Sequence, residues 1–110
     1  MNSGIEYYKT KLSTLRAEKQ LIENSERLNY ERQCISELIA LCMSLVHELS
    51  DIENENKYTD KYRKLLREDR DSLEASEIHN FHFQSSFVRV RIEYVSRALL
   101  YFNDNKNKTK

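Results

Sequence analysis

The spacing of apolar residues along most of this chain is that of a helix. In residues 5–22 the apolar side chains lie along one narrow side of a helix; they are Ile5, Tyr8, Leu12, Leu15 and Ile22. In residues 28–52 the apolar positions are denser, and at about 100° per residue they cover nearly half of the helix circumference. A stripe of that width predicts a second helix that is buried against two neighbours.

Residues 79–102 contain the one ambiguous pattern. From Val88 to Tyr94 apolar and charged residues alternate, as in a strand, but the alternation fails on both sides of this short stretch. On a helix the same region forms two apolar stripes. The first stripe comprises Phe81, Val88, Ile92, Val95, Leu99 and Phe102, and the second comprises Phe83, Phe87, Val90, Tyr94 and Tyr101. We therefore predict a helix that needs to be covered on two sides.

The polar stretch 51–61 interrupts the apolar pattern and predicts a turn. With one glycine and no proline in 110 residues, the chain lacks the turn residues of β-rich folds, so the expected class is all-α. Two arrangements fit: a long helical hairpin with its turn near residues 53–58, or a compact three- or four-helix bundle with a further break near 24–27 or 70–76. Residues 1–103 are expected to form a single domain, and the polar tail 104–110 is expected to fray.

The composition points to an intracellular protein. Charged residues make up 33% of the chain and hydrophobic residues 39%, which is typical of long amphipathic helices and coiled coils. No apolar run approaches the roughly 20 residues that cross a bilayer. The first residues lack the charged-then-apolar layout of a secretory signal. We expect a cytoplasmic, reducing location and no membrane partner.

One apolar patch predicts self-association. In the long hairpin, residues 35–42 would face the charged segment 67–77 and remain uncovered, and uncovered apolar patches usually mark interfaces. Oligomerisation, most simply as a homodimer, would complete the core. The predicted self-association face is Ile35, Leu38, Cys42, Leu45 and Leu49. Cys34 and Cys42 are too far apart on a straight helix for a disulfide and are expected to be buried thiols.

The second stripe of the C-terminal helix is the candidate for binding another protein. Aromatic side chains are frequent anchors of protein–protein contacts. The predicted partner-binding face is Phe83, Phe87, Val90, Tyr94 and Tyr101. The alternative is that this side is the core of a compact bundle. The leading interpretation is a non-enzymatic helical interaction module: an adaptor, a small chaperone or a subunit of a larger assembly.

Motifs that indicate catalysis are missing from the sequence. There is no glycine-rich phosphate loop and no nucleophile motif, so we expect no enzyme, cofactor or small-molecule ligand. His79 and His82 lie three residues apart with Glu77 nearby. No third ligand follows at a recognisable spacing, so no metal site is predicted and the histidines are expected at a surface or interface.

The two halves of the sequence differ in charge although the whole is neutral. Residues 1–55 contain six basic and ten acidic side chains, and residues 56–110 contain twelve and eight. Pairing of oppositely charged helices would explain the difference. The alternative is a helical nucleic-acid-binding or regulatory protein, in which basic side chains of segment 57–67 contact phosphates. Those candidates are Lys57, Lys61, Arg63, Lys64 and Arg67.

Overall fold

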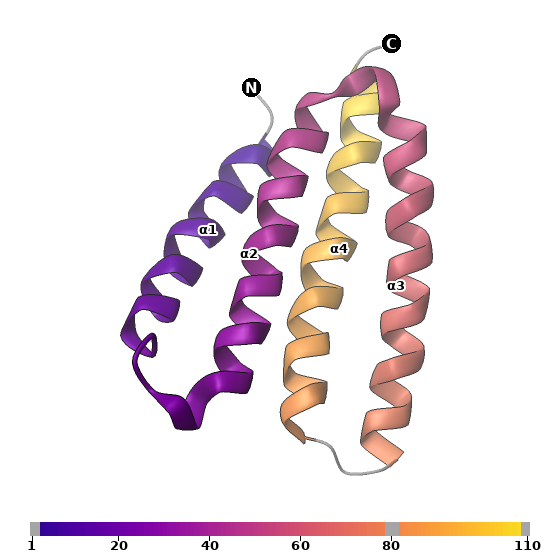
Figure 1. The fold of residues 1–110 in the computed structure, drawn as a ribbon. Coiled ribbons are helices and arrows are strands. Elements are labelled where there is room, and N and C mark those ends of the chain that lie inside the picture. Colours follow the sequence, from indigo (N-terminus) through magenta and orange to yellow (C-terminus); the bar gives the residue numbers. More distant parts are fainter. Residues whose placement is uncertain (1–2, 79–81, 109–110) are drawn as a thin grey trace. The chain divides into compact units, whose positions relative to one another are not determined.

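The chain is all-α in the part that the structure describes. The computed structural model describes the backbone of residues 3–78 and 82–108 and the side chains of residues 4–51, 53–75 and 86–103. Within these ranges it contains no strand (Figure 1). The α-helices are α1 (Ser3–Leu21), α2 (Asn29–Ser50), α3 (Glu55–Ile78) and α4 (His82–Lys108), and two short 3₁₀ helices are η1 (Glu26–Leu28) and η2 (Ile52–Asn54). The predicted all-α class is confirmed, and residues 88–94 are helical.

The helices form two units, Met1–Ser50 and Asp51–Lys110. In each unit two antiparallel helices pack side by side as a hairpin, α1 with α2 and α3 with α4 (Figure 1). The break predicted near 24–27 is confirmed. The break predicted near 70–76 is wrong, because α3 continues to Ile78. The turn predicted at 53–58 lies slightly earlier, since α3 already begins at Glu55.

Two further predictions concern domains and the tail. The single domain over residues 1–103 stays a prediction. α4 continues to Lys108, through most of the segment that the sequence predicts to fray, and residues 109–110 lie outside the described residues.

Apolar side chains at helical spacing form the core of the first hairpin. Tyr8, Leu12 and Leu15 of α1 are buried, as the narrow apolar stripe predicts. From α2 the buried apolar residues are Leu38, Cys42, Leu45 and Leu49. Tyr7 stacks edge-on against Tyr8, with ring centroids 5.0 Å apart.

A single arginine fixes the turn of the first hairpin. Residues 22–25 leave the helix, and in this turn the carbonyl oxygens of Ile22 and Ser25 accept the backbone N–H groups of Ser25 and Leu28 and can each accept one more donor. Arg32, in the first turns of α2, donates from Nη1 to the carbonyl oxygens of Ile22 (3.0 Å) and Glu23 (3.1 Å), and also to that of Ser25. Its Nη2 donates to Asn29 Oδ1 at 2.8 Å. The planar guanidinium, with five N–H donors, is suited to holding several acceptors at once.

Aromatic rings form the core of the second hairpin at the start of α3. The Phe102 ring of α4 lies 6.1 Å from the rings of both Tyr62 and Tyr58. Tyr62 and Phe102 are almost fully buried. The hydroxyl of Tyr58 donates to Asp51 Oδ2 at 2.7 Å, and Asn54 Nδ2 donates to the same oxygen at 2.9 Å. Asp51 thereby fixes the segment that leads into α3.

Candidate functional site

The predicted self-association face is largely buried in this structure. Leu38, Cys42, Leu45 and Leu49 are less than 10% exposed, and Ile35 is partly exposed. A second copy of the chain would therefore meet mainly Ile35 unless this face opens. Self-association through these residues stays a prediction.

The predicted partner-binding face is partly exposed. Phe87, Val90 and Tyr101 retain some exposed surface, whereas Tyr94 is 5% exposed. The side chain of Phe83 lies outside the described residues. The described aromatic residues of this face thus lie on three separate turns of α4, and not all of them are accessible to solvent. Their role in binding a partner stays a prediction.

Large exposed apolar side chains are scattered elsewhere in the described residues. They are Leu21, Tyr30, Met43 and Leu100. Leu100, at 65% exposed, lies on α4 away from both apolar stripes. Single exposed apolar residues are normal on protein surfaces and need no partner to explain them.

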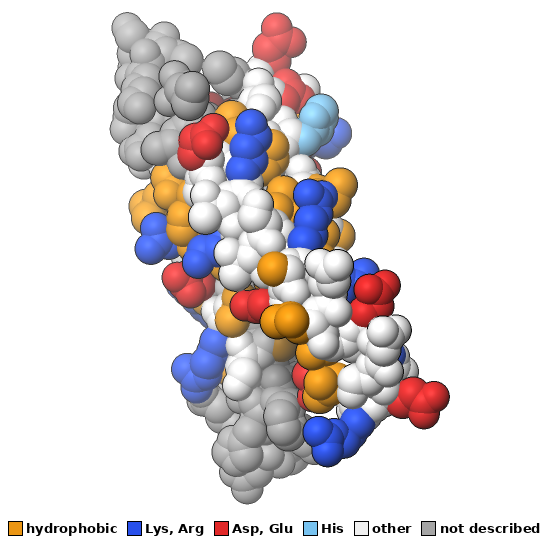
Figure 2. Space-filling model, turned by 90° about the vertical axis from the view of Figure 1, so that its left-hand side faces the viewer, with side chains coloured by type: hydrophobic (Ala, Val, Ile, Leu, Met, Phe, Trp, Pro, Cys, Tyr) orange, Lys and Arg blue, Asp and Glu red, His pale blue; other side chains and the backbone are white. Residues whose placement is uncertain are grey.

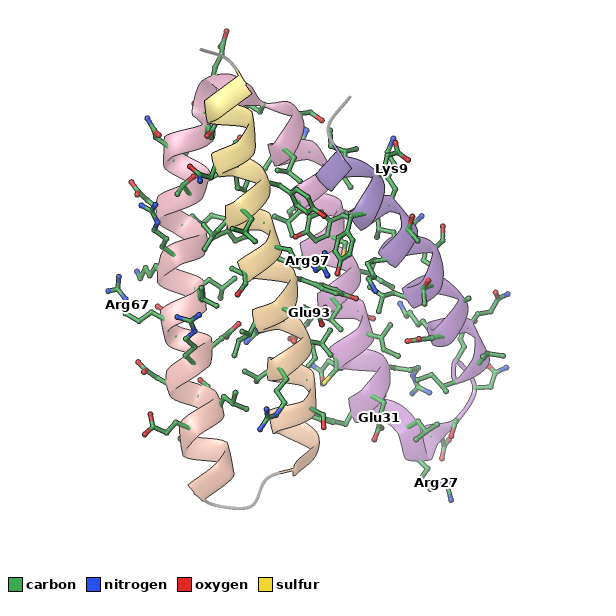
Figure 3. All side chains as sticks on the ribbon, turned by 180° about the vertical axis from the view of Figure 1, so that it is seen from behind. Lys9, Arg27, Glu31, Arg67, Glu93 and Arg97 are labelled. Carbon is green, nitrogen blue, oxygen red and sulfur yellow. The ribbon has the colours of Figure 1, made fainter. Side chains whose placement is uncertain are left out.

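The five basic side chains of segment 57–67 do not form a continuous basic face. All five are exposed, and Arg67 projects away from α3 (Figure 3). At about 100° per residue they are spread over the solvent-facing half of α3, with Asp60, Glu68 and Asp71 among them. Interspersed carboxylates weaken the attraction of a helix for phosphates, so this geometry gives nucleic-acid binding little support.

The charge difference between the halves disappears at the boundary of the structural units. Residues 1–50 contain six basic and seven acidic side chains, and residues 51–110 contain twelve and eleven. The imbalance depended on Asp51, Glu53 and Glu55, which belong to the start of the second unit. The face of the molecule seen in Figure 2 likewise carries positive and negative side chains interspersed. Each unit by itself is therefore close to electrically neutral.

Arg91 has a structural partner that the sequence analysis missed. Its Nε and Nη2 donate to the two carboxylate oxygens of Asp69, each at 2.7 Å. The side chain of Asp69 is 3% exposed and that of Arg91 27%. Arg91 also lies over the ring of Phe87, 5.1 Å from its centroid. A signal was available: Asp69 follows Tyr62 by seven residues, which puts an acid on the buried side of α3, where it needs a partner.

The thiols differ in exposure. Cys42 is fully buried, and this burial raises its pKa to about 11, with the Lys11 ammonium opposing the rise. Cys34 is only partly buried, so the prediction of two buried thiols is confirmed for Cys42 alone. Partial burial and a hydrogen bond with Cys34 raise the pKa of Tyr30. A thiol of raised pKa is a poor nucleophile at neutral pH.

The candidate histidine pair and its neighbouring glutamate lie in a part of the chain whose side chains the structure does not describe. His79 and the side chains of Glu77 and His82 lie outside the described residues. Among the residues that are described, no group of three or more His, Cys, Asp or Glu side chains could hold a metal ion.

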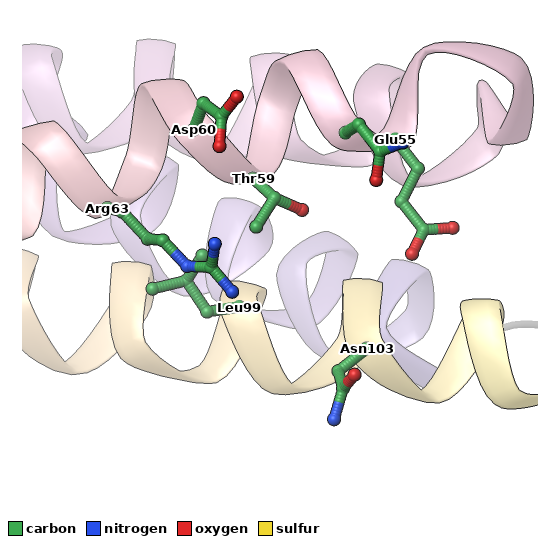
Figure 4. Close-up of a pocket in the computed structure, with 7 residues that line it drawn as sticks. Glu55, Thr59, Asp60, Arg63, Leu99 and Asn103 are labelled. Carbon is green, nitrogen blue, oxygen red and sulfur yellow. The ribbon is translucent and has the colours of Figure 1, made fainter.

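A polar hollow lies between the start of α3 and the end of α4. Its volume is about 230 Å³. The residues that line it are Glu55, Asn56, Thr59, Asp60, Arg63, Leu99 and Asn103 (Figure 4). Arg63, predicted as a phosphate contact, thus shares this hollow with two carboxylates. The hollow could not be predicted from sequence patterns, because its residues come from two separate helices.

The helices of the described residues include none that is both long and apolar enough to cross a membrane. Comparisons of this chain with protein-family models, with curated proteins and with solved structures found no match.

Proposed function

We propose that this chain is a non-enzymatic helical protein–protein interaction module that docks through the aromatic flank of α4. The aromatic flank is defined as Phe87, Val90, Tyr94 and Tyr101. The observation that supports the proposal is the width of the apolar surface of α4 compared with what α3 can cover.

The residues of α4 that contact α3 show which side of α4 faces α3. Phe102 stacks on Tyr62, and Arg91 pairs with Asp69. At about 100° per residue, Phe102 and Arg91 lie within about 20° of each other on α4. Together these two residues define the side of α4 that packs against α3 in the second hairpin.

The apolar surface of α4 is wider than the side that packs against α3, and it continues past that side in both directions around the helix. From Val90 round to Ile92 the apolar residues span about 200° of the circumference of α4. The apolar stripe of a surface helix that packs on one side is typically about 100° wide or somewhat more. The aromatic flank therefore extends past the side of α4 that faces α3. Its partly exposed members, Phe87, Val90 and Tyr101, offer surface to a further apolar partner, whereas Tyr94 is already buried. Aromatic rings combine a large contact area with few rotatable bonds, which suits them to this role.

A second copy of the chain is the partner to test first. Light scattering across a concentration series should give a mass that rises above that of a single chain. Phe87→Ala and Tyr101→Ala should each shift this rise to about tenfold higher concentration or more, equivalent to about 1.4 kcal/mol of lost contact. Tyr101→Ala is included because Phe87 also contacts Arg91 and its loss disturbs the ion pair.

Leu100→Ala is the matched control, because it removes an exposed apolar side chain from the same helix outside the aromatic flank. Circular dichroism should show that all variants remain helical. A mass of one chain at every concentration, or an equal effect of Leu100→Ala, would contradict docking through the aromatic flank.

A further inference from the structure

We propose that two copies of the chain dock through the aromatic flank with their α4 helices antiparallel, so that Arg97 of each copy pairs with Glu93 of the other. This arrangement rests on the proposed docking through the aromatic flank and adds the orientation of the partner and the residues that select it. It depends on the spacing of the aromatic rings along α4 and on an ion pair at the border of the flank.

The aromatic rings of the flank are evenly spaced along α4. Phe87 and Tyr101 lie seven residues before and after Tyr94, which is about 10 Å in each direction along the helix axis. Tyr94 is buried, whereas Phe87 and Tyr101 keep exposed surface. An antiparallel copy centred on Tyr94 would bring Phe87 of each chain opposite Tyr101 of the other. A parallel copy would pair like ring with like ring, so the rings alone do not select the orientation.

The border of the flank that lies away from α3 is charged. At about 100° per residue, Arg97 lies about 20° outside Val90 and Glu93 about 60° outside it. The Arg97 and Glu93 side chains are 48% and 57% exposed, and Arg97 Nε lies 3.9 Å from Glu93 Oε1 (Figure 3). An exposed contact of this length holds the two groups together only weakly, so each can exchange its partner.

The charged border favours the antiparallel orientation. A two-fold axis between antiparallel helices places the same border of both copies side by side, whereas parallel helices place opposite borders together. In the register centred on Tyr94, Arg97 lies about 3 Å along the axis from Glu93 of the second copy, and about 6 Å from its own Glu93. Two equivalent ion pairs then form between the copies. A parallel copy would put this border against Arg91 and Ala98, and that border of α4 has no carboxylate among the described residues.

The test is sedimentation equilibrium of the full chain with the two charges reversed in turn. Glu93→Arg and Arg97→Glu should each raise the dimer dissociation constant about tenfold or more, because each substitution places like charges opposite each other. An equimolar mixture of the two variants should return to within about threefold of the wild-type constant, because the mixed dimer again pairs opposite charges at both contacts.

The double variant Glu93→Arg/Arg97→Glu separates contacts between copies from a disturbed helix. It keeps an opposite-charge pair within the chain and both pairs between the copies, so it should self-associate like the wild type. Arg89→Glu is the matched control, because it makes the same charge change at an exposed position of α4 about 80° beyond Arg97. Its effect on the dissociation constant should stay below about twofold.

Two outcomes would overturn the arrangement in different ways. Self-association that Tyr101→Ala weakens but that the mixture of charge variants does not rescue would exclude the antiparallel register and leave docking through the aromatic flank standing. A wild-type chain that keeps the mass of one copy at every concentration would overturn both proposals.

Discussion

The first hairpin is closed by apolar side chains and one arginine at its turn, whereas the second contains an ion pair between its helices. α2 supplies Leu38, Cys42, Leu45 and Leu49 to the core of the first hairpin. α3 is mainly polar, and it contacts α4 through Tyr58, Tyr62 and the carboxylate of Asp69, while Leu66 is also buried. Both hairpins bury apolar residues, and those of the second include Leu66, Val88 and Val95. We expect the two-point ion pair to restrict the alignment of α3 against α4 in addition to these apolar contacts.

The largest effect should follow from removing Asp69. Asp69→Ala leaves the guanidinium of Arg91 without its partner, and loss of one member of a buried pair typically costs about 3–5 kcal/mol. Arg91 is 27% exposed and can reach water, so we expect a loss of about 2–3 kcal/mol in the free energy of unfolding. Urea denaturation of the wild type and of Asp69→Ala measures this loss in the free energy of unfolding.

The control for Asp69 is the exposed pair on α4. Arg97 Nε lies 3.9 Å from Glu93 Oε1, and both side chains are about half exposed (Figure 3). Glu93→Ala should therefore cost about 0–1 kcal/mol. Equal losses in Asp69→Ala and Glu93→Ala would show that the buried pair has no special role in the second hairpin.

A smaller effect is expected at the turn of the first hairpin. Arg32→Ala removes the donor to three carbonyl oxygens, and we expect a loss of about 1–2 kcal/mol, with faster hydrogen exchange at the end of α1. Arg32→Lys should recover less than half of the loss, because one ammonium cannot reproduce the planar fork. Arg27→Ala, an exposed arginine of the same connection, should change stability by less than about 0.5 kcal/mol. An equal loss of stability in Arg27→Ala would show that the contacts of Arg32 with the turn do not cause the effect.

The effect that is smallest at neutral pH concerns the thiol of Cys42, because its contribution to the stability of the first hairpin changes only in alkaline solution. The folded-state pKa of Cys42, about 11, lies above the roughly 8.5 of a free thiol. The folded state therefore favours the protonated thiol. This contribution to stability is complete below about pH 8.5 and decreases as the pH rises toward 11.

The Cys42→Ala variant isolates this contribution from other titrations. Wild-type stability should fall more than that of Cys42→Ala between neutral and alkaline pH, as urea unfolding measures. At neutral pH an alkylating reagent should modify the partly exposed Cys34 before Cys42. Parallel pH profiles, or equal rates at the two thiols, would contradict the burial of Cys42.

Several features of the fold were predictable because they depend on neighbours in sequence. The apolar spacing of residues 5–22 identified the buried side of α1, and the two stripes of residues 79–102 identified a helix despite the alternation at 88–94. The break near 24–27 was also predicted. The alternative break near 70–76 was wrong, because α3 continues without interruption to Ile78.

The helical class of this chain and the apolar sides of its helices follow from the spacing of residues, because helical periodicity places those residues on one side whatever they pack against. Three pairings depend on how the helices pack: Arg91 meets Asp69, Arg32 holds the turn of the first hairpin, and Glu55 and Arg63 share a hollow with Leu99. Those pairings join residues from different helices or across a turn. Their partners are selected by the packing of one helix against another, which the local pattern of either helix does not contain.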